Sequence, residues 1–177
     1  FKEIPEATIL FSSTAPIVYC SKHHLDFSQM RGLKAYILPT CNGQTLKAVE
    51  VESVTAGTGI LLKAAQAGTY KVPYCEDTSY SLNLLHGTTE DATLSPTEGE
   101  AVNYAYRASD GTFQRIAGQC QQVAGTAWLQ LPGHVAEGID ALSIVYGEAG
   151  SAGDVDGDGN VTIADVTSLV NFILGKE

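Results

Sequence analysis

The sequence has few basic residues, and this scarcity excludes two classes of partner. Lys and Arg total 10 of 177 residues against 20 Asp and Glu, so the formal net charge is -10 at pH 7. Proteins that bind nucleic acid or anionic membrane surfaces need basic side chains to neutralise phosphates. We therefore expect neither partner. From residue 148 onward there are six acids and one base, hence -5, so half of the negative charge lies in the last thirty residues.

Long apolar runs are also missing. No stretch reaches the roughly eighteen apolar residues that a transmembrane helix requires, so we expect no membrane span. The chain opens at Phe1, and no basic segment followed by an apolar one resembles a secretion leader. We expect a processed chain or a C-terminal piece of a longer protein.

Helical periodicity is nearly absent from residues 1–146. Short apolar or alternating runs are separated instead by Gly, Pro, Asn and Ser, which is typical of strands. Asp110-Gly111 indicates a hairpin turn between two of them. About ten such strands, with no helices for crossovers, predict an antiparallel β-sandwich. The expected strands are 7–11, 17–19, 33–38, 49–52, 59–62, 70–72, 101–107, 113–116, 128–131 and 141–146.

Residues 154–165 have the composition and spacing of a calcium loop. Oxygen side chains occupy positions 1, 3 and 5, Gly159 occupies position 6 and allows the backbone to reverse, and a carboxylate closes the loop at position 12. Four carboxylates in twelve residues repel one another unless a cation neutralises them. The sequence therefore predicts bound Ca²⁺, with a backbone carbonyl at position 7 and a hydroxyl or bridging water at position 9. The predicted ligands are Asp154, Asp156, Asp158, Asn160, Thr162 and Asp165.

A helix is predicted after this loop. Val166, Leu169, Val170 and Ile173 recur at helical spacing and form an apolar stripe, and Gly175 is a natural stop. A lone helix of this length is marginal in water, so the stripe must pack on something. Packing against the preceding residues or a missing repeat and packing against a partner protein both remain open.

The loop, its terminal Asp and this helix together resemble a dockerin type I repeat over residues 153–175. No helix-forming stretch precedes Asp154, which separates the segment from an ordinary helix-loop-helix calcium site. The resemblance implies the same six calcium ligands and a cohesin-like or other surface protein as partner. Dockerins that bind a cohesin normally have two such repeats, and one is present here.

A second resemblance covers most of residues 5–146. The phrases at 32–37, 54–63, 68–70 and 126–132 look like a β-sandwich module found near the C-termini of surface and secreted proteins of Bacteroidetes. That resemblance implies a non-catalytic module. The expected organisation is a β-sandwich over 1–146, a linker over 147–153 and a calcium repeat over 154–177.

The calcium requirement and the dockerin likeness both indicate an extracellular or cell-surface location. In that compartment an even number of cysteines favours oxidation, so we expect at least one disulfide. Three pairings remain open. The cysteines are Cys20, Cys41, Cys75 and Cys120.

Other chemistry is weaker in the sequence. Cys20 with His23 and His24 gives half a zinc site or a Cys/His pair, but no second paired spacing accompanies it. The acidic pairs 76–77 and 90–91 lie in polar stretches typical of solvated loops. Trp128 alternates with its neighbours and would face outward if they face inward, and Tyr104 and Tyr106 share a face of their strand. Such aromatic faces can bind sugars, although they more often form core.

We therefore expect a non-catalytic calcium-binding structural or attachment module of a secreted or cell-surface protein, in a context of polysaccharide breakdown. The alternatives are a carbohydrate-binding module and a fragment of a glycoside hydrolase.

Overall fold

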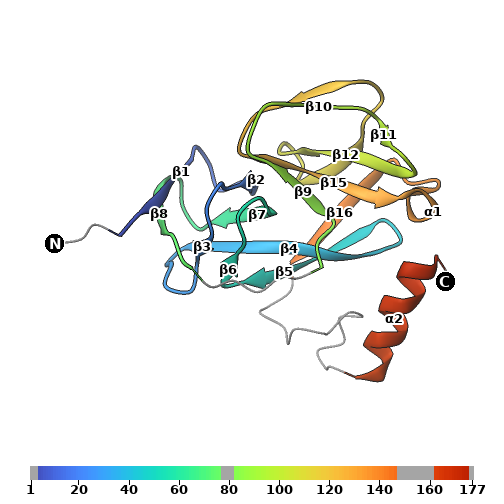
Figure 1. Ribbon diagram of the computed structural model, residues 1–177, viewed down its shortest axis with the longest axis horizontal. Helices are drawn as coiled ribbons and strands as arrows, with labels where there is room; N and C mark the ends of the chain where they lie inside the picture. The colour runs from blue at the N-terminus through green and yellow to red at the C-terminus, as the bar shows by residue number, and fades with distance from the viewer. Residues whose placement is uncertain (1–3, 77–81, 147–161, 176–177) are drawn as a thin grey trace.

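The computed structural model describes residues 4–76, 82–146 and 162–175, and their fold is mostly β (Figure 1). The predicted β-rich class is confirmed. One ten-stranded sheet dominates, and three two-stranded sheets accompany it. The large sheet runs β2 (Ile17–Cys20), β7 (Gly59–Ala64), β4 (Leu33–Asn42), β5 (Thr45–Val51), β16 (Ala141–Tyr146), β13 (Thr112–Arg115), β12 (Ala101–Arg107), β15 (Thr126–Pro132) and β9 (Leu85–Thr88), with β11 (Thr97–Glu98) paired to β12.

The smaller sheets are three antiparallel ribbons, and two helices complete the described residues. The ribbons are β1 (Glu6–Phe11) with β8 (Gly68–Pro73), β3 (Leu25–Asp26) with β6 (Ser53–Val54), and β10 (Ala92–Leu94) with β14 (Cys120–Gln122). The helices are α1 (Gly133–Ala136) and α2 (Ile163–Leu174).

The ten predicted strands all correspond to strands of the structure, and 101–107 and 141–146 match their bounds. The strands that the sequence did not reveal are short, from two to four residues, so alternation has no room to show in them. One feature differs from an all-antiparallel arrangement, because β5 and β16 pair in parallel. The two-layer sandwich stays a prediction.

The large sheet curls until its two ends meet along a seam. Thr58, next to β7, forms an antiparallel bridge with His86 of β9. The amide of Cys20, at the end of β2, donates a hydrogen bond to the carbonyl of Gly125, next to β15, at 3.0 Å. The first and last strands of the sheet therefore lie beside each other, as Figure 1 also shows.

Two glycines make this close approach possible. A Cβ placed on Gly87 would lie 2.5 Å from Cys20 Sγ and 2.9 Å from the amide nitrogen of Gly59. A Cβ on Gly59 would lie 2.9 Å from the Cβ of Ala127. All three distances are shorter than van der Waals contact, so any side chain at either position must push the seam apart.

Two hydrophobic cores lie on opposite faces of β4 and β7. In β4, Ala35 and Ile37 belong to one core, while Tyr36 and Leu38 belong to the other. Because successive side chains of a strand point to opposite faces, a strand buried on both sides is apolar throughout. This explains the run Gly59–Ala64, in which Lys63 alone is exposed.

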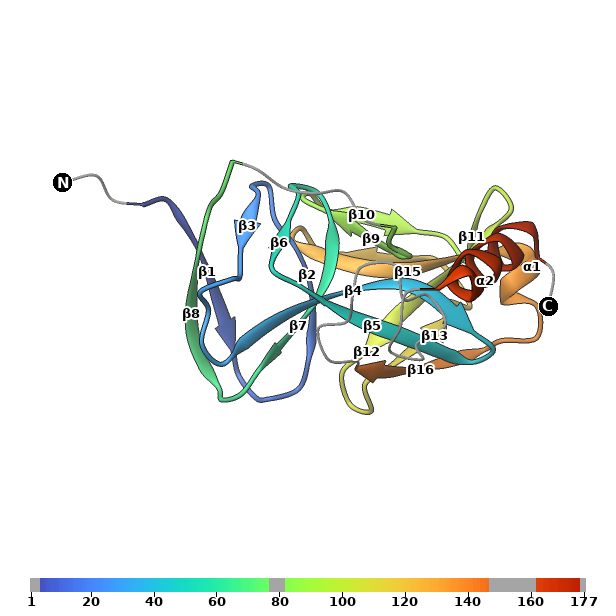
Figure 2. The ribbon, with the colours of Figure 1, turned by 90° about the horizontal axis from the view of Figure 1, so that it is seen from below.

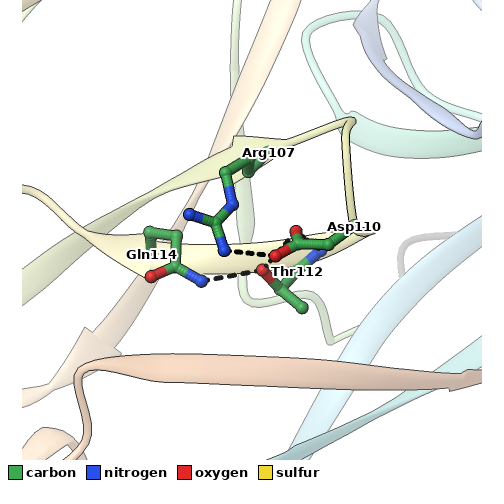
Figure 3. A network of polar contacts seen from close by, with 4 residues as sticks. All are labelled: Arg107, Asp110, Thr112 and Gln114. Atoms are coloured by element: carbon green, nitrogen blue, oxygen red, sulfur yellow. Dashed lines mark hydrogen bonds and ion pairs between the residues drawn. The ribbon is translucent and has the colours of Figure 1, made fainter.

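The predicted turn at Asp110-Gly111 joins β12 to β13 as expected. The carboxylate of Asp110 pairs with Arg107 and accepts hydrogen bonds from the amide and hydroxyl of Thr112, the latter at 2.7 Å (Figure 3). Gln114 extends the network by donating to the Thr112 hydroxyl. The hydrogen bond from Arg107 is the largest cause that lowers the pKa of Asp110 to about 2. Gly111 takes a φ of 69°, which favours glycine.

The expected disulfide is wrong for this structure, since none joins the four cysteines. Cys20 is enclosed at the seam, and Cys41 is buried in the core that contains Tyr104, where its thiol donates to the carbonyl of Gly43 at 3.3 Å. Cys75 and Cys120 are half-buried elsewhere. Burial raises the pKa of both Cys20 and Cys41 to about 11.

Replacing Gly87 by Ala is expected to destabilise the protein by about 1–3 kcal/mol, because the added methyl overlaps Cys20. Chemical denaturation measures this change. Gly118→Ala is the matched control, because a Cβ there meets nothing within 4 Å. Equal denaturation midpoints for the two variants would contradict the close contact between Gly87 and Cys20 at the seam.

Thiol titration of the native protein at pH 8 is expected to show prompt reaction at Cys75 and Cys120 only. The thiolate is the reactive species, and at a pKa of about 11 roughly one thiol in a thousand is ionised at this pH. Unfolding in guanidinium should then expose all four. A total of two reactive thiols in the unfolded protein, measured without reductant, would show that a disulfide exists.

Candidate functional site

The predicted calcium loop lies mostly outside the described residues. Asp154, Asp156, Asp158 and Asn160 fall there, so their role as ligands stays a prediction. Thr162 and Asp165 are described, and both lie at the start of α2.

Thr162 and Asp165 hold the first turn of α2 through reciprocal hydrogen bonds. The Thr162 hydroxyl accepts from the amide of Ala164 at 3.1 Å, and the Thr162 amide donates to Asp165 Oδ2. This arrangement resembles a capping box, with Asp in place of the usual Glu and with the hydroxyl bonded to the amide two residues on instead of three. Asp165 is 2% exposed, so its carboxylate is buried at the junction of the loop and the helix. The sequence analysis assigned Asp165 to the metal and missed this capping role.

The predicted helix is confirmed, and it ends where expected. Gly175 follows the last helical residue with a φ of 65°, the left-handed conformation in which glycine commonly ends a helix. The same glycine lies against the imidazole of His134 in α1, because a Cβ on it would be 2.5 Å from Cδ2 of that ring. Figure 2 shows α2 beside α1 and the end of β4.

The apolar stripe of α2 faces largely outward. Val166 and Ile173 are each 59% exposed, and Val170 is 43% exposed. Leu169 is half-buried, on the side of the helix that also carries the buried Asp165. In the described part of the chain, therefore, the whole stripe does not pack against the preceding residues.

The residues considered for zinc or nucleophilic chemistry have structural partners. His24 accepts a hydrogen bond from the amide of Ala56 at 3.1 Å, and His23 stacks on Tyr74 with ring centroids 4.2 Å apart. Cys20 is buried in the seam. Among residues 4–76, 82–146 and 162–175, no group of three His, Cys, Asp or Glu side chains could hold a metal ion.

The aromatic residues divide into core and surface. Ala127 and Leu129 are buried, so Trp128 faces the opposite side of β15, as predicted. Tyr104 is fully buried and donates its hydroxyl to the carbonyl of Ile139 at 2.7 Å, so it cannot contribute to a sugar-binding face. His86, which the sequence analysis left unassigned to any face, pairs with Trp128 across β9 and β15.

His86 and Trp128 form the most exposed aromatic pair of the large sheet. Their ring centroids are 6.1 Å apart with planes 25° apart. Desolvation lowers the pKa of His86 below its usual range, and the nearby carboxylate of Glu98 opposes this shift. The imidazole is therefore neutral near pH 7 and can both donate and accept a hydrogen bond.

No family model, curated protein or solved structure matches this chain. Among the described residues, no helix has the length and apolar character needed to cross a membrane.

Trp128 fluorescence is expected to titrate with a midpoint below pH 6.5, because protonation of the adjacent His86 changes the surroundings of the indole. Since the pKa of His86 is lower in the folded than in the unfolded protein, its contribution to stability is present above about pH 6.5 and is lost as the pH falls through the folded value. Glu98→Gln should lower the midpoint further. A midpoint at or above 6.5 would contradict the desolvation of His86.

Proposed function

We propose that this chain is a non-catalytic, calcium-binding attachment module of a secreted or cell-surface protein. The observation that carries the proposal is the twelve-residue loop 154–165, with oxygen ligands and glycine at calcium spacing, which leads into a helix with an outward apolar face. The comparisons offer no relative from which another activity could be inferred.

The start of α2 supports the metal site by its chemistry. Asp165 Oδ2 accepts from the Thr162 amide, so the carboxylate is directed toward the end of the loop rather than along the helix. A carboxylate can accept a hydrogen bond from an amide with one oxygen and coordinate a cation with the other. Calcium bound by the loop would offset the cost of burying this charge.

The outward face of α2 supports attachment. Val166, Val170 and Ile173 lie about one helical turn apart and are exposed together, whereas an isolated helix of this length gains most of its stability from packing. We propose that a cohesin-like or other surface protein covers this face.

The finer architecture belongs to the same proposal. The opposed cores on β4 and β7 support layers packed face to face, with 154–177 as a small calcium-binding appendage across the linker 147–153. A location outside the cell, where calcium is abundant, fits a site of this type. Polysaccharide breakdown is the proposed context, through the dockerin likeness.

Of the two alternatives, one has a specific observation in its favour. The outward pair of Trp128 and His86 favours a carbohydrate-binding function. No described feature specifically favours a glycoside hydrolase fragment.

Isothermal titration with CaCl₂ tests the metal site. The wild type is expected to bind one Ca²⁺ at or below millimolar concentration, and Asp158→Ala should weaken binding about tenfold or more because a charged ligand is lost. Asn160→Ala should matter less, since that position supplies a backbone carbonyl.

Asp165→Asn separates the metal role of this residue from its capping role. Asparagine retains an oxygen that can accept from the Thr162 amide but lacks the charge that calcium prefers. We expect the helix content measured by circular dichroism in saturating calcium to be retained and the calcium affinity to fall. Unchanged affinity would limit Asp165 to capping, and no calcium uptake by the wild type at millimolar concentration would refute the proposed function.

A further inference from the structure

A furrow crosses β9 on the surface of the large sheet. Two hollows, of about 240 and about 650 Å³, share Asn83 and His86 in their walls and therefore adjoin each other. The smaller extends to Thr58, and the larger extends to Glu100 and Gln130. Together they have the size of a site for a small molecule or a short oligomer.

The alternation of β9 and β15 determines which side chains face this surface. Leu85 and Leu129 point into the core, so His86 and Trp128 point outward, opposite each other in the register of the two strands. Gln130 is two residues beyond Trp128 and shares its face. His86 and Gln130 therefore line the furrow, and Trp128 packs beside His86 on the same face of the sheet.

The furrow has a rigid floor. Asn83 Oδ1 accepts from the amides of Leu38 and Leu85 at 3.0 and 3.1 Å, and its Nδ2 donates to the carbonyl of Gly59. Gln130 Nε2 donates to Glu98 and to Asn103, each at 3.1 Å. These bonds fix the groups around the furrow before any ligand arrives, which reduces the entropy lost on binding.

Two polar side chains of the furrow have no polar partner within the described protein. No hydrogen bond or ion pair joins the imidazole of His86 or the carboxylate of Glu100 to another described residue, and both side chains are exposed. The imidazole offers a donor and an acceptor at the centre, and the carboxylate offers acceptors at one end. Fixed polar groups that lack partners inside a concave surface are suited to a ligand rich in hydroxyls.

We propose that this furrow binds a short neutral glycan, with the imidazole of His86, stacked on Trp128, as a platform for a sugar face and Glu100 and Gln130 as hydrogen-bonding partners for its hydroxyls. A sugar ring has an apolar C–H face and a polar rim, and this surface offers a partner for each. The carboxylates of Glu98 and Glu100 disfavour an anionic glycan. This inference does not rest on the proposed calcium function.

Trp128 is the single tryptophan of the chain and stacks on His86, which lines the furrow, so intrinsic fluorescence reports on binding there. The full chain is titrated with neutral hexasaccharides of glucose, xylose and mannose, and with oligogalacturonate as an anionic probe. We expect at least one neutral probe to change the emission saturably, with a Kd at or below about 1 mM, and the anionic probe to have no effect. Excess EDTA should leave the affinity unchanged, which separates this site from the calcium loop.

Variants assign the signal to the furrow. His86→Ala is expected to weaken binding at least about tenfold and Glu100→Gln about threefold. Each change removes a group that forms no hydrogen bond or ion pair with another described residue and is therefore available to the glycan. Glu6→Gln, on β1, is the control for the second change and should bind as the wild type does. Folding of each variant is checked by its denaturation midpoint.

Three outcomes would overturn the proposal. These are the absence of a saturable response to every neutral probe up to about 10 mM, binding of the anionic probe alone, and an unchanged affinity in a folded His86→Ala variant.

Discussion

The close approach of backbone to side chain at the seam is the constraint on which the rest of the β structure depends. With glycine at positions 59 and 87, β9 can lie against β7 and the side chain of Cys20. The sheet then curls almost closed and encloses one core, while the outer face of β4 and β7 remains available for the other. A wider seam would separate Thr58 from His86, which are bridged across it.

The seam also accounts for the location of the furrow. The side chain of Asn83 forms hydrogen bonds with the backbones of β4, β7 and β9, so it joins the strands that meet at the seam. It lies next to His86 in the wall of both hollows. The amide group of Asn83 therefore has hydrogen-bond partners within the protein and serves the structure of the seam. His86 and Glu100, which have no polar partner among the described residues, face the hollow.

At the other end of the chain, one short segment serves two physical purposes. Asp165 holds the amide of Thr162 and so begins α2, and it occupies the last position of the predicted calcium loop. Gly175 ends the helix in contact with His134. The helix is thus capped locally at its start and held by a tertiary contact at its end, while Val166, Val170 and Ile173 remain exposed along its outer side.

The sequence by itself determined the β-rich class, the positions of the longer strands, the hairpin at Asp110-Gly111, and the presence and stop of α2, because each depends on periodicity or turn chemistry within a few residues. It also supplies the calcium hypothesis, since loop ligands lie close in the chain. Only the tertiary structure decided that Cys20 and Cys41 are buried apart, that Tyr104 is core, that β5 and β16 run parallel, and that His86, Asn83 and Glu100 share a furrow. Those residues meet through strand pairing across the sheet, and the free energy of such distant contacts leaves no local pattern in the chain.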